Sequence, residues 1–185
     1  MSSREMRLLA VAALVLAVPA AAQRIGAVDV GVFGRYTDFD NSLALDNAIG
    51  FGGRAAVFVQ PGIALELDVS RSSADPAGGG SSVSHTPVRF RFVGALPSGS
   101  HVDVLLGGGY VHNSYGGSVD AGDGGVSLLL GLRHHTSNSV WVRLGLDMDL
   151  MFHTSSTSPF EFYTGNWSLQ LGVGTLLNNG GAQSR

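Results

Sequence analysis

Cysteine and lysine are absent from this 185-residue sequence, and charged residues are scarce. Without cysteine the chain forms neither disulfides nor thiolate metal clusters, so its stability must come from its own packing. Charged side chains make up 14% of the residues, against a usual level of about 25%. The net charge is -3 and every basic residue is arginine, which leaves no basic field for nucleic acid.

A long apolar run is also missing after the first segment of the chain. No later stretch approaches the roughly 20 apolar residues that a membrane-spanning helix requires. The sequence therefore excludes a helical membrane protein.

The first segment has the pattern of a secretory signal peptide. Arg4 and Arg7 precede an apolar run from Leu8 to Val18, and three alanines at 20–22 then offer small residues for cleavage. We expect residues 1–22 to be removed on export. A bacterial envelope destination follows.

What the chain does have is alternation between apolar and polar or small residues. From Ser139 to His153 the even positions are all apolar, whereas the odd positions include Arg143, Asp147 and Asp149. Successive side chains of a strand point to opposite faces, so one face is apolar and the other is charged. The same pattern recurs along the chain and predicts these strands: Ile25–Thr37, Ile49–Gln60, Ile63–Ser72, Thr86–Ala95, His101–Asn113, Gly125–Arg133, Ser139–Phe152 and Asn166–Leu177.

The predicted connections alternate between short and long. Three are brief turns rich in Pro, Gly, Ser and Asn. The other four are longer and polar, and run over Asp38–Ala48, Ser73–His85, Ser114–Gly124 and His153–Gly165. Short periplasmic turns and longer extracellular loops are typical of outer-membrane β-barrels. We therefore predict an all-β fold: an eight-stranded antiparallel up-and-down transmembrane β-barrel with both termini in the periplasm.

Strand parity sends six acidic residues and six arginines to the inside of this barrel. An eight-stranded barrel is just wide enough for side chains to fill it, and charges buried there must pair. We interpret the set as a structural polar core, with a narrow gated pore as the alternative. Its members are Asp29, Arg35, Arg54, Glu66, Asp68, Arg89, Arg91, Asp103, Arg133, Arg143, Asp147 and Asp149.

The charged face also carries many glycines, which argues against a soluble lipocalin-like barrel with its charges in water. A water-facing position has no need of a small residue, whereas a crowded lumen does. These glycines are Gly31, Gly52, Gly107, Gly109, Gly131, Gly145, Gly172 and Gly174.

Aromatic residues on the apolar face cluster at the strand ends next to the long connections. Such girdles mark the membrane interface. The outer girdle comprises Tyr36, Phe51, Tyr110, Phe152 and Trp167, and Phe92 is the best candidate for an inner one. Parity sends a single charged side chain, Arg71, toward lipid, near the outer strand end where an arginine can reach headgroups.

With these elements placed, the chain resembles the small outer-membrane β-barrel family that includes OmpA- and OmpX-like domains. The segments that carry the likeness are Ile63–Val69, Thr86–Phe92, Leu105–Tyr110 and Trp167–Gly174. The resemblance covers nearly all of residues 23–177, which we expect to form the barrel. A short polar tail, residues 178–185, follows in the periplasm and departs from the terminal aromatic usual in such barrels.

The resemblance and the composition together predict a non-catalytic monomer in the bacterial outer membrane. Its role would be envelope integrity, or surface interaction through the four long loops. We expect its partners to be outer-membrane lipid and lipopolysaccharide, the barrel assembly machinery and an unidentified loop partner. We expect no catalytic, cofactor-binding or metal-ligating residues.

One enzymatic alternative is a lipid A deacylase-like esterase, because such barrels carry a His-x-Ser pair on the lipid-facing surface. His112 and Ser114 match that pair, and Asp120 or Asp123 would have to orient the histidine. The Asn-Ala that follows in that family is absent, and Glu161 is the first glutamate downstream.

Three other polar clusters have weaker patterns. His153 begins a second His-x-Ser triplet, but parity turns it inward. His134 and His135 are predicted to lie in a solvated turn. Asp38 begins like a calcium loop, yet the sequence lacks that loop's required Gly and Glu.

Overall fold

The computed structural model describes residues 25–117, 121–137, 139–155 and 158–177, and the side chains of 153–164 are left out of the description. Within these ranges, eight antiparallel strands close into one barrel in sequential order. The strands are β1 (Val28–Asp38), β2 (Ala48–Gln60), β3 (Ile63–Ala74), β4 (Val83–Pro97), β5 (Val102–Gly117), β6 (Ala121–His135), β7 (Val140–Ser155) and β8 (Ser158–Leu177). The predicted fold is confirmed, and the predicted signal peptide lies outside the described residues.

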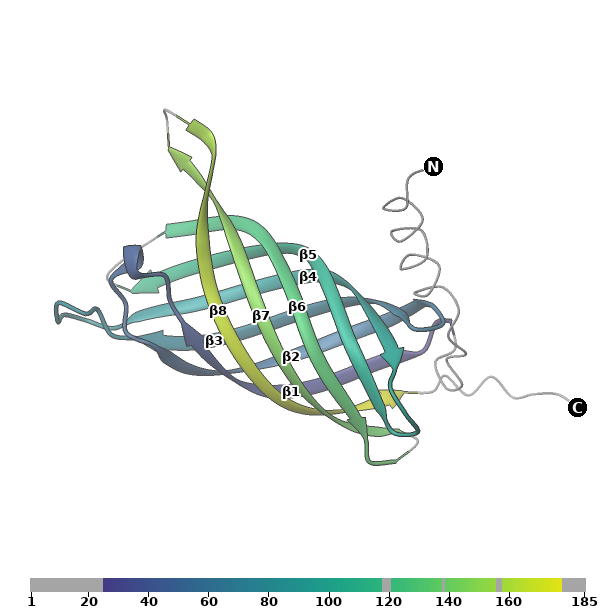
Figure 1. Ribbon diagram of the computed structural model, residues 1–185. Coiled ribbons are helices and arrows are strands. Elements are labelled where there is room, and N and C mark those ends of the chain that lie inside the picture. Colours follow the sequence, from purple (N-terminus) through teal and green to yellow (C-terminus); the bar gives the residue numbers. More distant parts are fainter. Residues whose placement is uncertain (1–24, 118–120, 138, 156–157, 178–185) are drawn as a thin grey trace, which may run out of the picture.

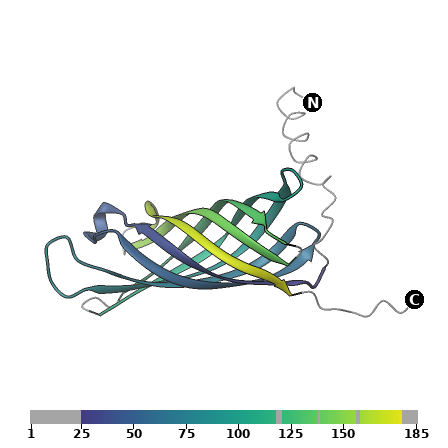
Figure 2. The same ribbon diagram turned by 90° about the horizontal axis from the view of Figure 1, so that it is seen from below.

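The barrel is closed by β1, which pairs with both β2 and β8. Figures 1 and 2 show the strands wrapping obliquely around the barrel, as closure of a sheet requires. The start of β1, the end of β8 and the three short turns lie at one end, which we name the short-turn end. The opposite end, where β1 leads to β2 and β7 to β8, is the long-loop end.

The short turns fit the residues that the sequence places there. Gly62 and Gly99 have φ values of 77° and 102°, a left-handed conformation in which a side chain would be strained. Gly62 completes the β2–β3 turn after Pro61, and Gly99 lies between β4 and β5. These two turns therefore depend on glycine for their backbone geometry.

At the long-loop end, two connections predicted to be loops are mostly strand. β5 and β6 stay paired as far as Tyr115 and Ala121, and β7 and β8 as far as Ser155 and Ser158. The reason is that an antiparallel ladder is made by backbone groups and continues through polar residues. The β7–β8 hairpin accordingly projects beyond the barrel (Figure 1).

The first long connection follows the prediction, since β1 ends at Asp38 and β2 begins at Ala48. It contains a short 3-10 helix, η1 (Asn41–Leu43), capped by Asp40, whose carboxylate accepts a hydrogen bond of 2.8 Å from the Ser42 backbone N–H. In the stretch that begins like a calcium loop, Asp38 ends β1 and Asp40 caps η1. Among the described residues, no group of three or more His, Asp or Glu side chains could hold a metal ion.

The outward face of the strands is apolar, as parity predicts. Leu106, Leu130 and Leu171 are about half exposed or more, although they are large aliphatic side chains. Tyr36, Phe51, Tyr110 and Trp167 are also exposed and Phe152 is half-buried, and Phe92 is exposed nearer the short-turn end. An apolar exterior with aromatic residues near its edge is the surface that a lipid bilayer solvates. No helix in the described ranges is long and apolar enough to cross a membrane.

Inside the barrel, glycines make room for two aromatic rings. Trp141 lies against Gly31, where an added Cβ would come within 2.6 Å of its ring. The Phe33 ring lies against Gly52, where an added Cβ would come within 2.6 Å of the ring's Cε2. Both aromatic side chains are almost fully buried. The glycines of the inner face are therefore the counterpart of large lumenal side chains, as their placement in the sequence suggests.

Candidate functional site

The lumen is the candidate site because every charge that parity sends inward is buried there. All twelve predicted residues are at most 7% exposed, and Asp68, Arg89, Arg91, Asp147 and Asp149 are fully buried. Burial of so many ions is tolerable only where they pair and satisfy one another's hydrogen bonds. The contacts that pair them lie in layers along the barrel.

The central layer joins strands from opposite walls of the barrel. Arg35 donates to Asp68 on β3 and to Asp147 on β7, each at 3.0 Å. Arg91 on β4 contacts Asp147 as well and donates to Glu66 at 2.8 Å. Each bridging arginine therefore ties together carboxylates from two strands.

Three further contacts extend this layer. Arg143 on β7 reaches across to Glu66 with both terminal nitrogens, one of them at 3.1 Å. Arg89 binds both oxygens of Asp149, at 3.1 and 2.5 Å. The Gln170 amide donates to Asp147 at 2.8 Å, so that this carboxylate accepts from three residues.

A second layer lies toward the short-turn end. Arg133 bridges Asp103 at 2.7 Å and Asp29 at 3.3 Å, and the Trp141 indole N–H donates to Asp29 at 2.9 Å. His135 lies 2.8 Å from Asp103 through its Nε2. The prediction of a solvated His134-His135 turn is wrong for His135, because β6 continues through both residues and brings His135 to the Asp103 carboxylate.

Arg54 departs from the expectation that each arginine pairs with a carboxylate. Within the described residues it forms no ion pair, and its hydrogen-bond acceptor is the Gln170 side-chain oxygen. Its guanidinium carbon lies 4.6 Å from the Phe33 ring centroid and 5.8 Å from that of Trp141. A cation over aromatic faces is attracted by the ring quadrupoles, and this attraction grows when water is excluded.

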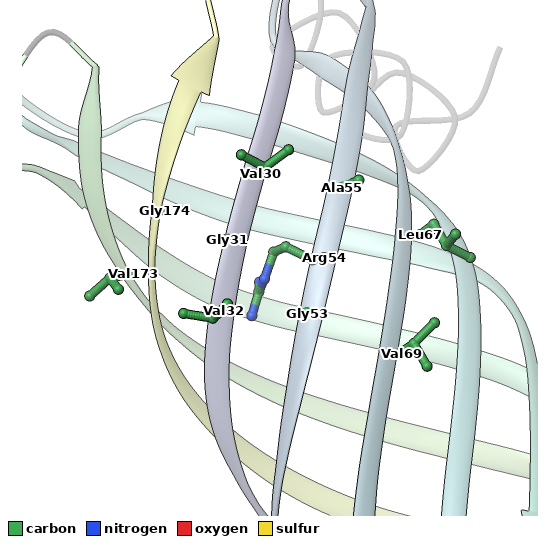
Figure 3. A pocket seen from close by; sticks show the side chains of 10 residues that line it. All are labelled: Val30, Gly31, Val32, Gly53, Arg54, Ala55, Leu67, Val69, Val173 and Gly174. Atoms are coloured by element: carbon green, nitrogen blue, oxygen red, sulfur yellow. The ribbon is translucent and has the colours of Figure 1, made fainter.

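The wall outside Arg54 is thin. Figure 3 shows the arginine behind a groove on the outer face, where the outward-facing Gly53 carries no side chain. Val30, Val32 and other aliphatic residues border this groove. The groove is thus a depression in the apolar exterior, and the buried cation belongs to the lumen.

The lumen is closed at the long-loop end by an apolar cluster that we call the mouth plug. It consists of Phe39, Ala48, Ala74, Val83 and Tyr115, and Leu43 and Leu45 pack against it from the first connection.

Polar contacts hold that connection over the mouth. The Asp40 backbone N–H donates to Asn166 on β8 at 3.2 Å, and Asn166 donates to the Tyr115 hydroxyl at 3.3 Å. Leu45 pairs with Pro76 in a β-bridge between the first and second long connections. Sequence reasoning missed this plug, because Phe39 and Leu45 lie in a connection that was predicted to be an ordinary polar loop.

His85 lies directly beneath the mouth plug. Its ring stacks on Tyr115 with centroids 5.1 Å apart and meets the edge of Phe39 at 5.0 Å. Its Nε2 lies 3.1 Å from the Asn113 side-chain oxygen. The charged layers are therefore separated from the loops by a packed aromatic and amide layer.

The residues of the enzymatic alternative do not come together. His112 and Ser114 are exposed on the outer face of β5, as predicted. Asp123 is the register partner of Asn113, a buried residue of the inner face, so it lies on the opposite side of the sheet from His112. Asp120 and the side chains of His153 and Glu161 lie outside the described residues.

Comparison with known proteins identifies the family and the fold. The family model described as "Outer membrane protein beta-barrel domain" matches residues 8–175. No curated protein matches the chain significantly.

Among solved structures, the barrel is similar to OprG from Pseudomonas aeruginosa, with a TM-score of 0.62 and 11% identity over 84% of this chain and 98% of that one. It is similar to Neisserial surface protein A, with a TM-score of 0.63 and 14% identity over 80% and 96% of the two chains. It is also similar to the N-terminal barrel of OprF from Pseudomonas aeruginosa, with a TM-score of 0.53 and 14% identity over 80% of this chain and 97% of that one. At these identities the likeness establishes the fold alone.

Proposed function

The chain belongs to the outer membrane protein β-barrel family, and on this basis we propose that it is a non-catalytic envelope scaffold that holds surface loops in place. Its location is the bacterial outer membrane. The scaffold works as a monomer, and its loops serve surface interaction or envelope integrity. The lumen holds the barrel together and forms no steady pore.

The observation that carries this proposal is the ion-paired lumen beneath the mouth plug. Arg35, Arg91 and Arg143 span the interior and bind carboxylates on other strands. A steady pore needs a continuous file of water along its lumen, whereas here side chains from opposite walls meet. These contacts support a structural role for the charges.

The orientation follows from the loops. We place the long-loop end at the cell surface and the short-turn end in the periplasm, the usual arrangement for such barrels. A signal peptide over residues 1–22 directs export, and residues 178–185 form a periplasmic tail. The barrel assembly machinery inserts the folded strands.

A conductance measurement tests the scaffold. Purified protein in planar bilayers is expected to give at most small, intermittent currents, because Arg91, Glu66 and Asp147 block the central lumen. A matched variant, Phe39→Ala, removes the ring of the mouth plug but leaves the ion pairs in place, so it should conduct no better. Large and steady currents from the native protein would refute the scaffold proposal.

The enzymatic alternative has its own test. We expect that expression of the native protein leaves the acyl pattern of lipid A unchanged, because Asp123, the described acid closest to His112 in register, lies on the opposite face of the sheet. Ser114→Ala should give the same pattern. Mass spectrometry of lipid A from expressing cells measures this directly. Loss of an acyl chain with the native protein, restored by Ser114→Ala, would make the protein an esterase.

A further inference from the structure

Arg71 stands apart from the other arginines of the barrel. Among the described strand residues it is the one arginine on the outward face, where its neighbours along β3 are Leu67 and Val69. It is exposed, and within the described part of the chain it has neither a hydrogen bond nor an ion pair. A cation on an otherwise apolar exterior costs free energy unless an anion or water meets it.

The position of Arg71 along the barrel is fixed by its cross-strand partner. It pairs in register with Phe51 of β2, one of the exposed aromatic residues near the long-loop end. Aromatic girdles lie at the level of lipid headgroups. The guanidinium therefore extends from the depth at which acyl chains give way to charged headgroups.

A groove on the outer face surrounds this arginine, and we name it the Arg71 groove. Ile49 and Phe51 line one side of it, and serines from β3 and β4 line the other. The Ser84 hydroxyl donates its proton to the Gly116 carbonyl at 3.2 Å, so the hydroxyls that can donate to an anion are those of the exposed Ser73, its register partner, and Ser82. Glycines 116 and 117 leave the floor of the groove without side chains.

The backbone ladder is also interrupted beside the groove. Pairs between β3 and β4 run to Val69 opposite Val88 and resume at Ser72 opposite His85. Pro87 lies in this gap and has no N–H to donate to a ladder. The gap therefore falls where Pro87 of β4 has no N–H to pair with β3.

From these features we propose that the Arg71 groove binds a phosphate of the lipid A headgroup of lipopolysaccharide. The guanidinium fork matches two phosphate oxygens, and the Ser73 and Ser82 hydroxyls offer further donors on the polar side. The apolar side, Ile49 and Phe51, contacts the adjoining acyl chains. The choice of lipid A rests on the orientation given under Proposed function, because that orientation places the groove in the outer leaflet.

Native mass spectrometry of the purified, folded protein in detergent tests this site. Bisphosphorylated lipid A is the probe, with dephosphorylated lipid A and phosphatidylglycerol as comparison lipids. We expect the native protein to retain lipid A, and Arg71→Gln to bind it about tenfold more weakly, since it loses a charge-assisted contact. Arg71→Lys keeps the charge but loses the fork, and should fall between the two.

His112→Gln is the matched control, because His112 is also polar, exposed and outward-facing near the long-loop end. It should bind lipid A as the native protein does. Heat-modifiability on a gel verifies that each variant is folded. If Arg71→Gln fails to fold, Arg71→Lys tests the site in its place.

Three results would overturn the proposal. If Arg71→Gln binds lipid A as tightly as the native protein does, Arg71 is not part of a lipid A site. If the native protein binds dephosphorylated lipid A equally well, the site does not recognise the phosphate. If the native protein retains phosphatidylglycerol as well as lipid A, the site is not specific for lipid A. None of these results depends on conductance, so the scaffold and the lipid site can fail separately.

Discussion

Asp147→Ala is expected to lower the free energy of unfolding of the barrel by about 3–5 kcal/mol, the typical cost of removing one partner of a buried ion pair. The Asp147 carboxylate is fully buried and accepts from Arg35, Arg91 and Gln170. Its removal leaves two guanidinium groups short of a partner in a lumen with little water. Asp147, on β7, thus accepts hydrogen bonds from side chains on three other strands, β1, β4 and β8.

Urea unfolding of the protein in lipid vesicles, followed by tryptophan fluorescence, measures this effect. Asp46→Ala is the matched control, since Asp46 is an exposed aspartate of the first long connection. Its effect should stay within about 0.5 kcal/mol, as for most surface substitutions. If the two variants unfold at the same urea concentration, the lumenal network does not stabilise the barrel.

Much of the fold is predictable from the sequence because a strand has a period of two. Once Arg143 and Asp147 are assigned to the lumenal face, every second residue of β7 is assigned to that face as well. Because the exterior must be apolar all around the barrel, the charged face of each other strand must also point to the lumen. For this reason all twelve lumenal charges and the exposed aromatics lie where parity places them. Glycines such as Gly31 then indicate where a large side chain must fit.

The partners of those charges are not predictable in the same way. Parity assigns a side to Arg91, but its contacts with Glu66 and Asp147 depend on the tilt of the strands and the closure of the barrel. Arg54 illustrates the limit, because its acceptor is an amide and its neighbours are aromatic rings. A balance of six acids and six arginines indicates pairing without saying which residues pair.

The ends of the barrel were the least predictable part. Residues Tyr115 to Gly117 have no apolar alternation, yet they continue β5 because β4 offers a matching ladder. Phe39 leaves β1 as a loop residue and returns over the lumen, where it meets His85. Both features depend on contacts between segments far apart in the sequence, which periodicity does not report.

The exterior carries the second large expected effect. Leu146→Arg should destabilise the barrel by roughly 2–4 kcal/mol, the cost of an arginine near the middle of the bilayer on the lipid face of such a barrel. Leu146 is exposed, lies near the middle of β7, and pairs with Leu130 and Leu169 on the neighbouring strands. Its surroundings therefore offer the new guanidinium no polar partner.

His112→Arg is the matched control for depth, because His112 is outward-facing and lies two residues beyond Tyr110 toward the long-loop end. An arginine near the interface should cost only about 0–1 kcal/mol, since its side chain can reach water and headgroups. The same vesicle unfolding assay compares the two variants. If both arginines cost the same, the outward face of β7 does not meet the hydrocarbon core, and the assignment of this face to lipid would be wrong.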